Sequence, residues 1–595
     1  MSGIAGIFSK NKLSYTQECI MKSIQHDMAL RGNDKKGKWI SQSKQVMFAY
    51  NMLSFRNTPE EISQTLTYEN LTIVYDGSIY NYKELKRQLV QNGYAFLSDN
   101  EMEVILKAYH FWGENVLKKI HGTFAFAIWD DYSHTLTLCR DRFGLKPLYY
   151  YFTEKEFYFA SSLPALVKNV NSDKTISKEA LLLYLSMQAV LPPPYTPFNE
   201  FNKLAPQSIL QISLSAERLQ VFYKKNDIMV ESFTPIVLFQ DIKIEMVRDY
   251  LIESISNRIP KDTDIGLWLS GGLDSSLITA ICVKELGIKP KTISIAFNGS
   301  NDYNNQENEL CYSRDVVAKY PTQHMELFIE DNEILNNIED CLRIANEPMM
   351  SNDYIGHYIL SKYTHQQGLK VALTGLGADE IWYGYSWHKE LLYTNMNKIN
   401  CFYKAFVERN FNKCESIISK DFIGPNYLDM FVLSYLDRFD MNGFESAVFS
   451  NLDLIMPEDP IKRSDSAGMS HMVELRAPFL DENLVDLSFK IPHKIKLFNG
   501  IGKYILKKVA EEYFSKPFIY RKKGHFTVPA INMTTGKVHT FCRDVLLSES
   551  CRNRGVFQTE MLEALVNQKK ANITQLGGNL LWQLTCYEYW MQQFD

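Results

Sequence analysis

Apolar and aromatic runs dominate the first third of the chain. The runs at residues 70–81, 122–131, 135–144 and 148–161 are broken by glycine, aspartate and charged turns, which is typical of strands. Residues 82–93 lie between two of them and carry a helical spacing that ends on a glycine. Strands in succession with helices between them predict stacked antiparallel sheets with helices outside.

The pattern changes after a proline-rich, extended stretch at residues 189–198, which we interpret as the connection to a second half. Residues 264–287 indicate a buried strand, a glycine turn and an apolar-periodic helix. Residues 291–300 indicate a further strand, and residues 368–384 repeat the strand and the turn. This rhythm predicts a doubly wound parallel sheet, in which ligands bind beyond the carboxyl ends of the strands. Beyond about residue 400 the pattern is mostly helical.

Length and composition support two globular domains, which we place at residues 1–205 and 206–595. The 595 residues are 45% hydrophobic and carry a net charge of −5, which gives no sign of nucleic-acid or membrane binding. The ten cysteines form no CxxC pair, and no apolar run reaches the length of a membrane span. We therefore expect a soluble, cytoplasmic protein with reduced thiols.

The stretch LSGGLDSS at residues 269–276 carries the strongest chemical signal. Its glycines allow a tight turn and a close approach to a ligand, and the helix that follows points its positive end at an anion. The spacing is not that of a Walker A loop. An embedded Asp274 would repel phosphate unless a cation intervenes, so we expect Mg²⁺ there. The predicted phosphate-binding residues are Ser270, Gly271, Gly272, Asp274, Ser275 and Ser276.

A second glycine turn, LTGLGADE at residues 373–380, follows another predicted strand. It offers Thr374, Gly375 and Asp379. Alone it is equally compatible with an ordinary turn. In a doubly wound sheet it could lie beside the first turn, so that Asp274 and Asp379 share Mg²⁺.

Several long motifs in the same order resemble the glutamine-dependent asparagine synthetase family. They include GIAGIF (3–8), RDRFGLKPLYYY (140–151), LSGGLDSS, TGLGADE, ELRAPFLD (474–481), GKYILKKVA (502–510) and RKKGHFTVP (521–529). SGGLDSS is also similar to the pyrophosphate loop of the ATP-pyrophosphatase group. The resemblance implies an N-terminal-nucleophile glutaminase-like αββα sandwich in front of a synthetase domain. That domain would adenylate a carboxylate with ATP and Mg²⁺ and let an amine displace AMP.

The resemblance also implies roles for individual residues. Lys523 matches a lysine that contacts phosphate and the oxyanion, although a solvated basic run is the alternative. Trp268 and Phe297, with Thr374 and Gly375 opposite, match positions that line the adenine pocket, and core packing is the alternative for the two aromatic residues. Tyr385 matches the tyrosine of a family motif, where aromatic packing is an equal alternative.

The front half departs from the family pattern. The nucleophilic cysteine is replaced by Ser2, which could still act beside a free α-amine. The positions that the resemblance assigns to the glutamine pocket carry Met52, Asp76, Gly77, Ser78 and Glu101. Losing a bidentate arginine and placing a carboxylate at the oxyanion hole, where one lost donor costs about 3 kcal/mol, should abolish glutamine hydrolysis. We therefore expect Ser2 to be vestigial.

The synthetase half departs at Leu376, where the family has a glutamate close to the incoming nitrogen. A larger amine is then a better acceptor than free ammonia. Family members without glutaminase activity include β-lactam synthetases and lasso-peptide cyclases, so our leading hypothesis is an AMP-forming amide ligase of peptide or natural-product maturation. The alternatives are asparagine synthesis with glutamine or ammonia, an inactive scaffold, and a hydrolase with an active Ser2. The resemblance is compatible with a homodimer and with other maturation enzymes as partners.

Overall fold

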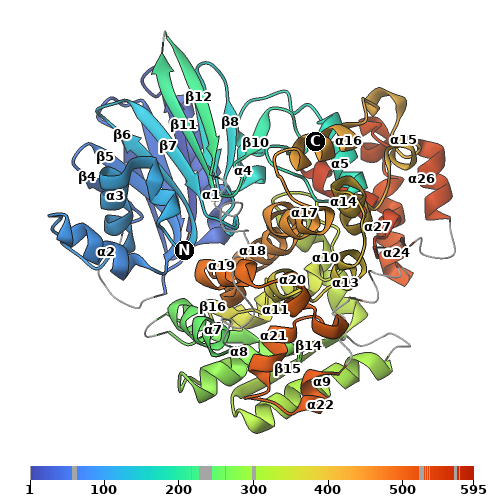
Figure 1. The fold of residues 1–595 in the computed structure, drawn as a ribbon. Coiled ribbons are helices and arrows are strands. Elements are labelled where there is room, and N and C mark those ends of the chain that lie inside the picture. The colour runs from blue at the N-terminus through green and yellow to red at the C-terminus, as the bar shows by residue number, and fades with distance from the viewer. Residues whose placement is uncertain are drawn as a thin grey trace. The chain divides into compact units, whose positions relative to one another are not determined.

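The computed structural model forms two compact units, Met1–Ser177 with Pro193–Ser232 and Lys178–Pro192 with Phe233–Asp595 (Figure 1). It describes residues 2–55, 63–215, 217–226, 244–260, 263–297, 303–521, 528, 531, 534, 536–567, 573, 574 and 576–595. The side chains of Ser2 and of residues 303–309 are outside this description.

The first unit contains two six-stranded sheets whose neighbouring strands are antiparallel wherever their register is defined. The order in the first sheet is β10 (Phe201–Lys203), β8 (Tyr149–Phe152), β9 (Glu156–Ala160), β1 (Ser2–Ser9), β3 (Val46–Met52) and β2 (Lys35–Ile40). The order in the second is β12 (Arg218–Lys225), β11 (Ser208–Ser215), β7 (Thr135–Arg140), β6 (Gly122–Asp130), β5 (Leu71–Ile79) and β4 (Thr65–Tyr68).

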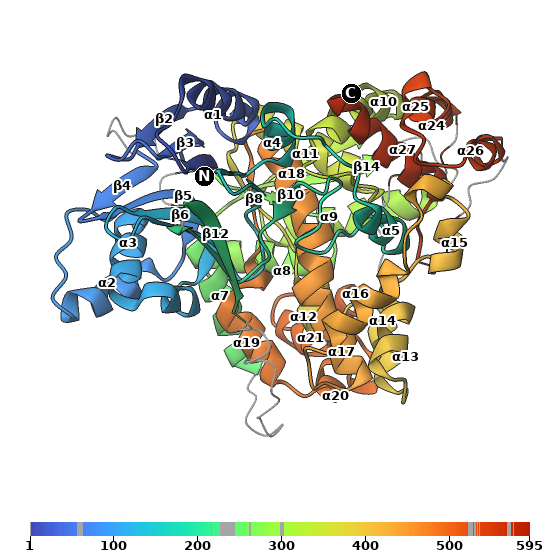
Figure 2. The same cartoon turned by 90° about the horizontal axis from the view of Figure 1, so that it is seen from above.

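The two sheets pack face to face between two layers of helices. Side chains of both inner faces, such as Phe48 and Trp129, share one buried apolar cluster. Helices α2 (Tyr82–Gln91) and α3 (Glu101–Trp112) close a second cluster on the outer face of the second sheet (Figure 2). Helices α1 (Tyr15–Asp27) and α4 (Leu163–Asn169) pack on the first sheet. The predicted αββα sandwich is therefore confirmed.

The border between the units differs from the predicted one at residue 205. Strand β11 pairs with β7, and β12 pairs with β11 to complete the second sheet, so the first unit continues to residue 232. Helix α5 (Lys178–Ser186) belongs to the second unit, although it precedes the proline-rich stretch. Within the second unit, Tyr184 donates a hydrogen bond to the Gln583 carbonyl and accepts the Gln583 side chain at its own carbonyl. The prolines therefore mark a return to the first unit and not the start of the second.

The second unit is built on a parallel five-stranded sheet. Its order is β15 (Gln323–Ile329), β14 (Lys291–Phe297), β13 (Gly266–Trp268), β16 (Val371–Leu373) and β17 (Glu474–Arg476). The chain leaves β13 toward β14 and β15 and then returns to the other side of β13. The strand order therefore reverses between β13 and β16, which is where open α/β sheets bind ligands.

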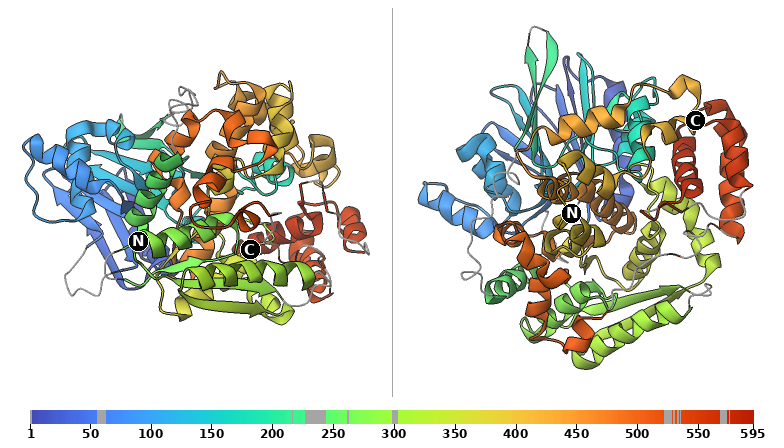
Figure 3. Two further views of the ribbon diagram at one scale, coloured as in Figure 1. Left: turned by 60° about the horizontal axis from the view of Figure 1, so that its bottom comes forward. Right: turned by 45° about the vertical axis from the view of Figure 1, so that its right-hand side comes forward.

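Helices cover this sheet and fill the rest of the second unit. Leu360 and Tyr363 of α11 (Tyr354–Gln366) pack on one face, and α9 (Tyr303–Lys319) packs against β14 (Figure 3). The helices are α7 (Ile244–Arg258), α8 (Leu273–Lys284), α9 (Tyr303–Lys319), α10 (Asp331–Ile344), α11 (Tyr354–Gln366), α12 (Ala378–Trp382), α13 (Ser386–Leu392), α14 (Lys398–Phe406), α15 (Phe411–Glu415), α16 (Tyr427–Leu436), α17 (Gly443–Ser450), α18 (Lys462–Ser470), α19 (Glu482–Lys490), α20 (His493–Lys496), α21 (Tyr504–Ala510), α22 (Lys516–Ile519), α24 (Gly536–Leu546), α25 (Glu549–Arg554), α26 (Thr559–Val566) and α27 (Leu580–Met591).

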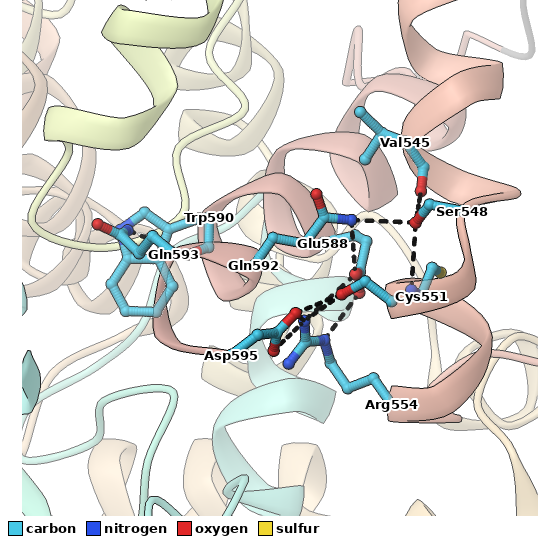
Figure 4. Close-up of polar contacts among 10 residues, drawn as sticks. Val545, Ser548, Cys551, Arg554, Glu588, Trp590, Gln592, Gln593 and Asp595 are labelled. Atoms are coloured by element: carbon cyan, nitrogen blue, oxygen red, sulfur yellow. Dashed lines mark hydrogen bonds and ion pairs between the residues drawn. The ribbon is translucent and has the colours of Figure 1, made fainter.

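The last helices are held together by a buried ion pair (Figure 4). The Arg554 guanidinium lies 3.1 Å from Glu588 Oε2 and 2.8 Å from Asp595 Oδ1. Glu588 is fully buried, and removing one partner of such a pair would leave an uncompensated charge. This contact fixes α25 against α27. Within the described residues, no helix is both long and apolar enough to cross a membrane.

Candidate active site

The first glycine turn leads from the end of β13 into α8. Gly272 caps the helix, and Gly271 has φ +76°, a conformation that suits glycine. The Gly272 N–H donates to Ser270 Oγ at 3.3 Å, and Ser270 Oγ lies 3.2 Å from Ser275 Oγ. Ser276 Oγ is buried and has no hydrogen-bond partner among the described residues. The turn therefore presents hydroxyl and N–H groups at a helix N-terminus, as an anion site requires.

The second glycine turn lies directly beside the first. It leads from β16 to α12, and Gly377 starts this short helix with φ +94°. An added Cβ on Gly375 would lie 3.0 Å from Asp274 Cβ, so the two turns touch. Thr374 Oγ1 is a second buried hydroxyl without a partner among the described residues. The predicted neighbourhood of the two turns is thus what the structure shows.

A lysine holds the two predicted metal-binding carboxylates together. Lys503 Nζ lies 2.6 Å from Asp274 Oδ2 and 2.9 Å from Asp379 Oδ1. Burial alone would lower the pKa of Lys503, but the two carboxylates outweigh it and place the pKa above its usual range. The ammonium therefore stays charged, and it shows that the pair is arranged for a cation.

Sequence reasoning missed Lys503 and the glycine behind it. The sequence placed Lys503 in the GKYILKKVA motif, but the motif does not indicate which residues the Lys503 side chain contacts. Its backbone has φ +56°, and its N–H donates to the Trp382 carbonyl at 2.9 Å. An added Cβ on Gly384 would lie 1.7 Å from Asp379 Oδ1 and 2.4 Å from Lys503 Cε. Gly384 is therefore required for this ion pair.

Arg521 reaches the first turn from the end of α22. Its Nη2 donates to the Gly271 carbonyl at 2.9 Å, and its guanidinium lies 3.6 Å from the centroid of the Tyr312 ring. The predicted catalytic Lys523 lies outside the described residues, two positions after Arg521. Its role stays a prediction.

The aromatic residues predicted to line an adenine pocket are buried at the ends of their strands. Trp268 is 8% exposed, belongs to the apolar cluster of the sheet and donates from Nε1 to Thr364 Oγ1 at 3.1 Å. Its ring lies 5.3 Å from that of His357, whose pKa burial lowers to about 4. Phe297 ends β14 and is 6% exposed. Most of the surface of Trp268 and of Phe297 is therefore buried by packing within the protein.

Tyr385 forms a hydrogen bond with a buried carboxyl close to Asp274 and Asp379. Its hydroxyl donates to Glu380 Oε1 at 2.6 Å. Burial, and then the charge of Asp379, raises the pKa of Glu380. The role of Tyr385 in this structure is therefore a hydrogen bond in addition to aromatic packing.

The structure brings most of the predicted glutamine pocket together around the start of β1. Ser2 pairs with Met52 across β1 and β3, and Met52 is 7% exposed. Asp76 lies in β5 with no exposed surface, 3.8 Å from Arg31 Nη2. Gly77 and Ser78 follow it in β5.

Glu101, at the start of α3, points its carboxylate at the same strand. Glu101 Oε2 accepts the Ile79 N–H at 2.8 Å and the Tyr75 hydroxyl at 3.2 Å. The Glu101 carboxylate is therefore hydrogen-bonded within the protein. At the positions predicted for the glutamine pocket, the structure thus has an arginine–aspartate contact and a glutamate whose carboxylate is hydrogen-bonded within the protein.

Comparison with known proteins decides the family. The family model described as asparagine synthase matches residues 246–592. The chain belongs to the asparagine synthase family. A second model, described as a glutamine amidotransferase domain, matches residues 1–223, which covers β11 and most of β12.

Individual relatives of the asparagine synthase family match most of the chain. It is 30% identical over 591 residues to the glutamine-hydrolyzing asparagine synthetase 1 of Bacillus subtilis (strain 168), covering 92% of this chain and 90% of that protein. A putative asparagine synthetase of Mycobacterium bovis is 25% identical over 554 residues, with 85% and 83% covered.

A solved B. subtilis glutamine PRPP amidotransferase covers 55% of this chain and 81% of its own, at 13% identity and a TM-score of 0.28.

Membership of the asparagine synthase family makes the chain a carbon–nitrogen ligase that uses ATP and gives AMP and pyrophosphate. The two turns fit this chemistry, because they offer buried hydroxyls, N–H groups and a carboxylate pair arranged for a cation. Within the described residues, no group of three or more His, Cys, Asp and Glu side chains is placed to hold a metal ion. A divalent cation at Asp274 and Asp379 would therefore take its other ligands from phosphate or water.

Proposed function

We propose that the second unit activates a carboxylate as its acyl adenylate and joins it to an amine larger than ammonia, while the first unit hydrolyses no glutamine. One observation carries the proposal. The two glycine turns meet at the point where the strand order reverses, and Asp274 and Asp379 lie there on either side of the Lys503 ammonium. Such a site is costly to maintain and has no benefit for a core.

The proposed reaction has two steps. An oxygen of the substrate carboxylate attacks the α-phosphorus of ATP, and pyrophosphate leaves. The amine then attacks the acyl carbon, AMP leaves and the amine loses a proton. When bound, Mg²⁺ would neutralise charge on the phosphates. Asp274 and Asp379 would hold it, and Ser276, Thr374 and the N–H groups of the first turn would bind phosphate oxygens.

The preference for a larger amine rests on Leu376. This half-buried residue stands in the second turn, between Gly375 and Gly377. An apolar side chain can neither bind ammonium nor accept a proton. A larger amine can be held by contacts away from the reacting nitrogen, because binding energy from remote parts of a substrate supports catalysis.

The proposed absence of glutaminase activity is argued from the residues of the predicted glutamine pocket in the first unit. Asp76 is fully buried beside Arg31, and it would repel the oxyanion of a tetrahedral intermediate. Met52, opposite Ser2, offers no charge to the carboxylate of glutamine. Binding and chemistry are both impaired by these changes.

Asparagine synthesis is the second candidate, and the 30% identity to the B. subtilis enzyme over 92% of this chain favours it. One assay separates the two. The protein is incubated with ATP, Mg²⁺, aspartate and either glutamine or ammonium, and pyrophosphate, asparagine and glutamate are measured. The proposal predicts no glutamate and no more than trace asparagine. Stoichiometric asparagine would refute it, and glutamate from glutamine alone would show that Ser2 is active.

A further inference from the structure

Lys503 occupies the position where a cation would bridge the two carboxylates. Its Nζ lies within 3 Å of one oxygen of each, at 2.6 and 2.9 Å, while the side chain is 7% exposed. Mg²⁺ binds carboxylate oxygens at about 2.0–2.1 Å, so a metal ion and this ammonium cannot lie between the same two oxygens. Their charges would also repel each other strongly in a buried site.

The lysine is held in this place by the backbone around it. The N–H of Lys503 donates to the Trp382 carbonyl at 2.9 Å, and its carbonyl accepts the Lys507 N–H at 2.8 Å. Gly384 closes one side, because even a methyl group there would collide with Lys503 Cε and Asp379 Oδ1. The ammonium can therefore leave only by a change of side-chain rotamer, away from Gly384.

A departing ammonium needs a new anionic partner. Asp274 lies in the first turn of α8, two residues after Gly272, so phosphate oxygens bound at this helix N-terminus would lie beside its carboxylate. Phosphate could then accept Lys503 and at the same time supply the ligands that two carboxylates cannot. A metal ion alone brings neither an anionic partner for Lys503 nor the further metal ligands.

We propose that Lys503 excludes the divalent cation from Asp274 and Asp379 until the phosphates of the nucleotide arrive, so that metal enters with the nucleotide and not before it. The inference rests on the proposed function, because it takes the two aspartates as metal ligands. It adds an order of binding and names the residue that sets this order. Lys503 is a positioning residue here, since it acts through the carboxylates.

The test is Mn²⁺ binding to the full-length protein without nucleotide, followed by electron paramagnetic resonance of the free ion. We expect no tight site in the wild-type protein and one site at least tenfold tighter in Lys503→Met. The double variant Lys503→Met/Asp274→Asn should lose that site. Lys508→Met, on the same helix with a half-buried Lys508–Glu511 pair, is the matched control and should behave as wild type. If Lys503→Met does not fold, Lys503→Gln takes its place.

A second titration adds inorganic pyrophosphate, and it separates failure of the inference from failure of the proposed function. Tight Mn²⁺ binding by the wild-type protein without pyrophosphate would overturn the inference alone. A second result would also overturn the inference alone. In it, the wild-type protein and Lys503→Met bind Mn²⁺ equally weakly without pyrophosphate, while pyrophosphate creates an Mn²⁺ site that needs Asp274. No Mn²⁺ site under any condition would overturn both. Pyrophosphate-dependent binding in wild type, with pyrophosphate-independent binding in Lys503→Met, supports both.

Discussion

At the scale of single residues, the two halves differ in how their charged groups are paired. In the second unit, Asp274 and Asp379 face the Lys503 ammonium. In the first unit, Asp76 is fully buried beside Arg31, and Glu101 accepts the Ile79 N–H. The first arrangement pairs two carboxylates with one cationic group, while the second places a buried carboxylate where we predicted an oxyanion site.

Gly384→Ala should disable the second arrangement. The added methyl group would overlap Asp379 Oδ1 and Lys503 Cε, so the carboxylate must move from its place beside Asp274. We expect ATP–pyrophosphate exchange to fall at least tenfold, with an unchanged circular dichroism spectrum. Gly368→Ala is the control, because its Cβ would meet nothing within 4 Å and its φ of +74° adds only backbone strain of about 1–2 kcal/mol. Equal loss in both variants would contradict this account.

Lys496 should make stability depend on pH. Burial lowers its pKa to about 7, although the face of the Tyr383 ring, 4.3 Å away, favours the charged form. Between pH 7 and the ordinary lysine pKa near 10.4, the unfolded chain binds a proton that the folded one lacks. The free energy of unfolding should therefore rise with pH, by at most about 1.4 kcal/mol per pH unit.

The measurement for Lys496 is the melting temperature between pH 7 and 9. It should rise across this range in the wild-type protein, and the rise should be smaller in Lys496→Met. Lys494→Met, exposed on the same short helix, should keep the wild-type slope. A slope that Lys496→Met leaves unchanged would show that another group is responsible.

At the scale of elements, the sequence predicts the strands well and the long-range contacts poorly. Strand β5, strand β13 with helix α8, and the turn after β16 lie where apolar runs and glycines predict them. These signals are local. The pairing of β11 with β7 depends on contacts across about 70 residues, as between Ile209 and Cys139. The predicted border at residue 205 therefore comes before strands that belong to the first unit. Lys503 lies 229 residues from Asp274, so no spacing rule could join them.

Arg521, two residues after the end of α22, contacts the first glycine turn, where we propose that phosphate binds. With the Gly271 carbonyl held by the guanidinium, the Gly272 N–H of the same peptide faces the opposite way, toward Ser270. Arg521→Ala should therefore raise the KM for ATP about tenfold in pyrophosphate exchange and change kcat less. Arg521→Lys should restore only part of the affinity, because an ammonium cannot stack on Tyr312 as a planar guanidinium does. An unchanged KM in Arg521→Ala would show that the contact has no role in nucleotide binding.

At the scale of the whole molecule, the chain combines an amidotransferase fold with a synthetase domain. The first unit keeps two complete sheets and two apolar clusters, so its fold does not depend on the residues that glutamine hydrolysis needs. The second unit keeps the paired turns and the cation position. Folding and catalysis can separate in this way because cores are specified by buried apolar side chains and chemistry by a few polar ones.

The most direct test of this account is ATP–pyrophosphate exchange with a panel of amino-acid and peptide carboxylates, measured for the wild-type protein and for Asp274→Ala. We predict exchange that depends on one class of carboxylate, needs neither glutamine nor ammonium, and falls at least a hundredfold in Asp274→Ala. Exchange that persists in Asp274→Ala would contradict the assignment of the chemistry to the two glycine turns.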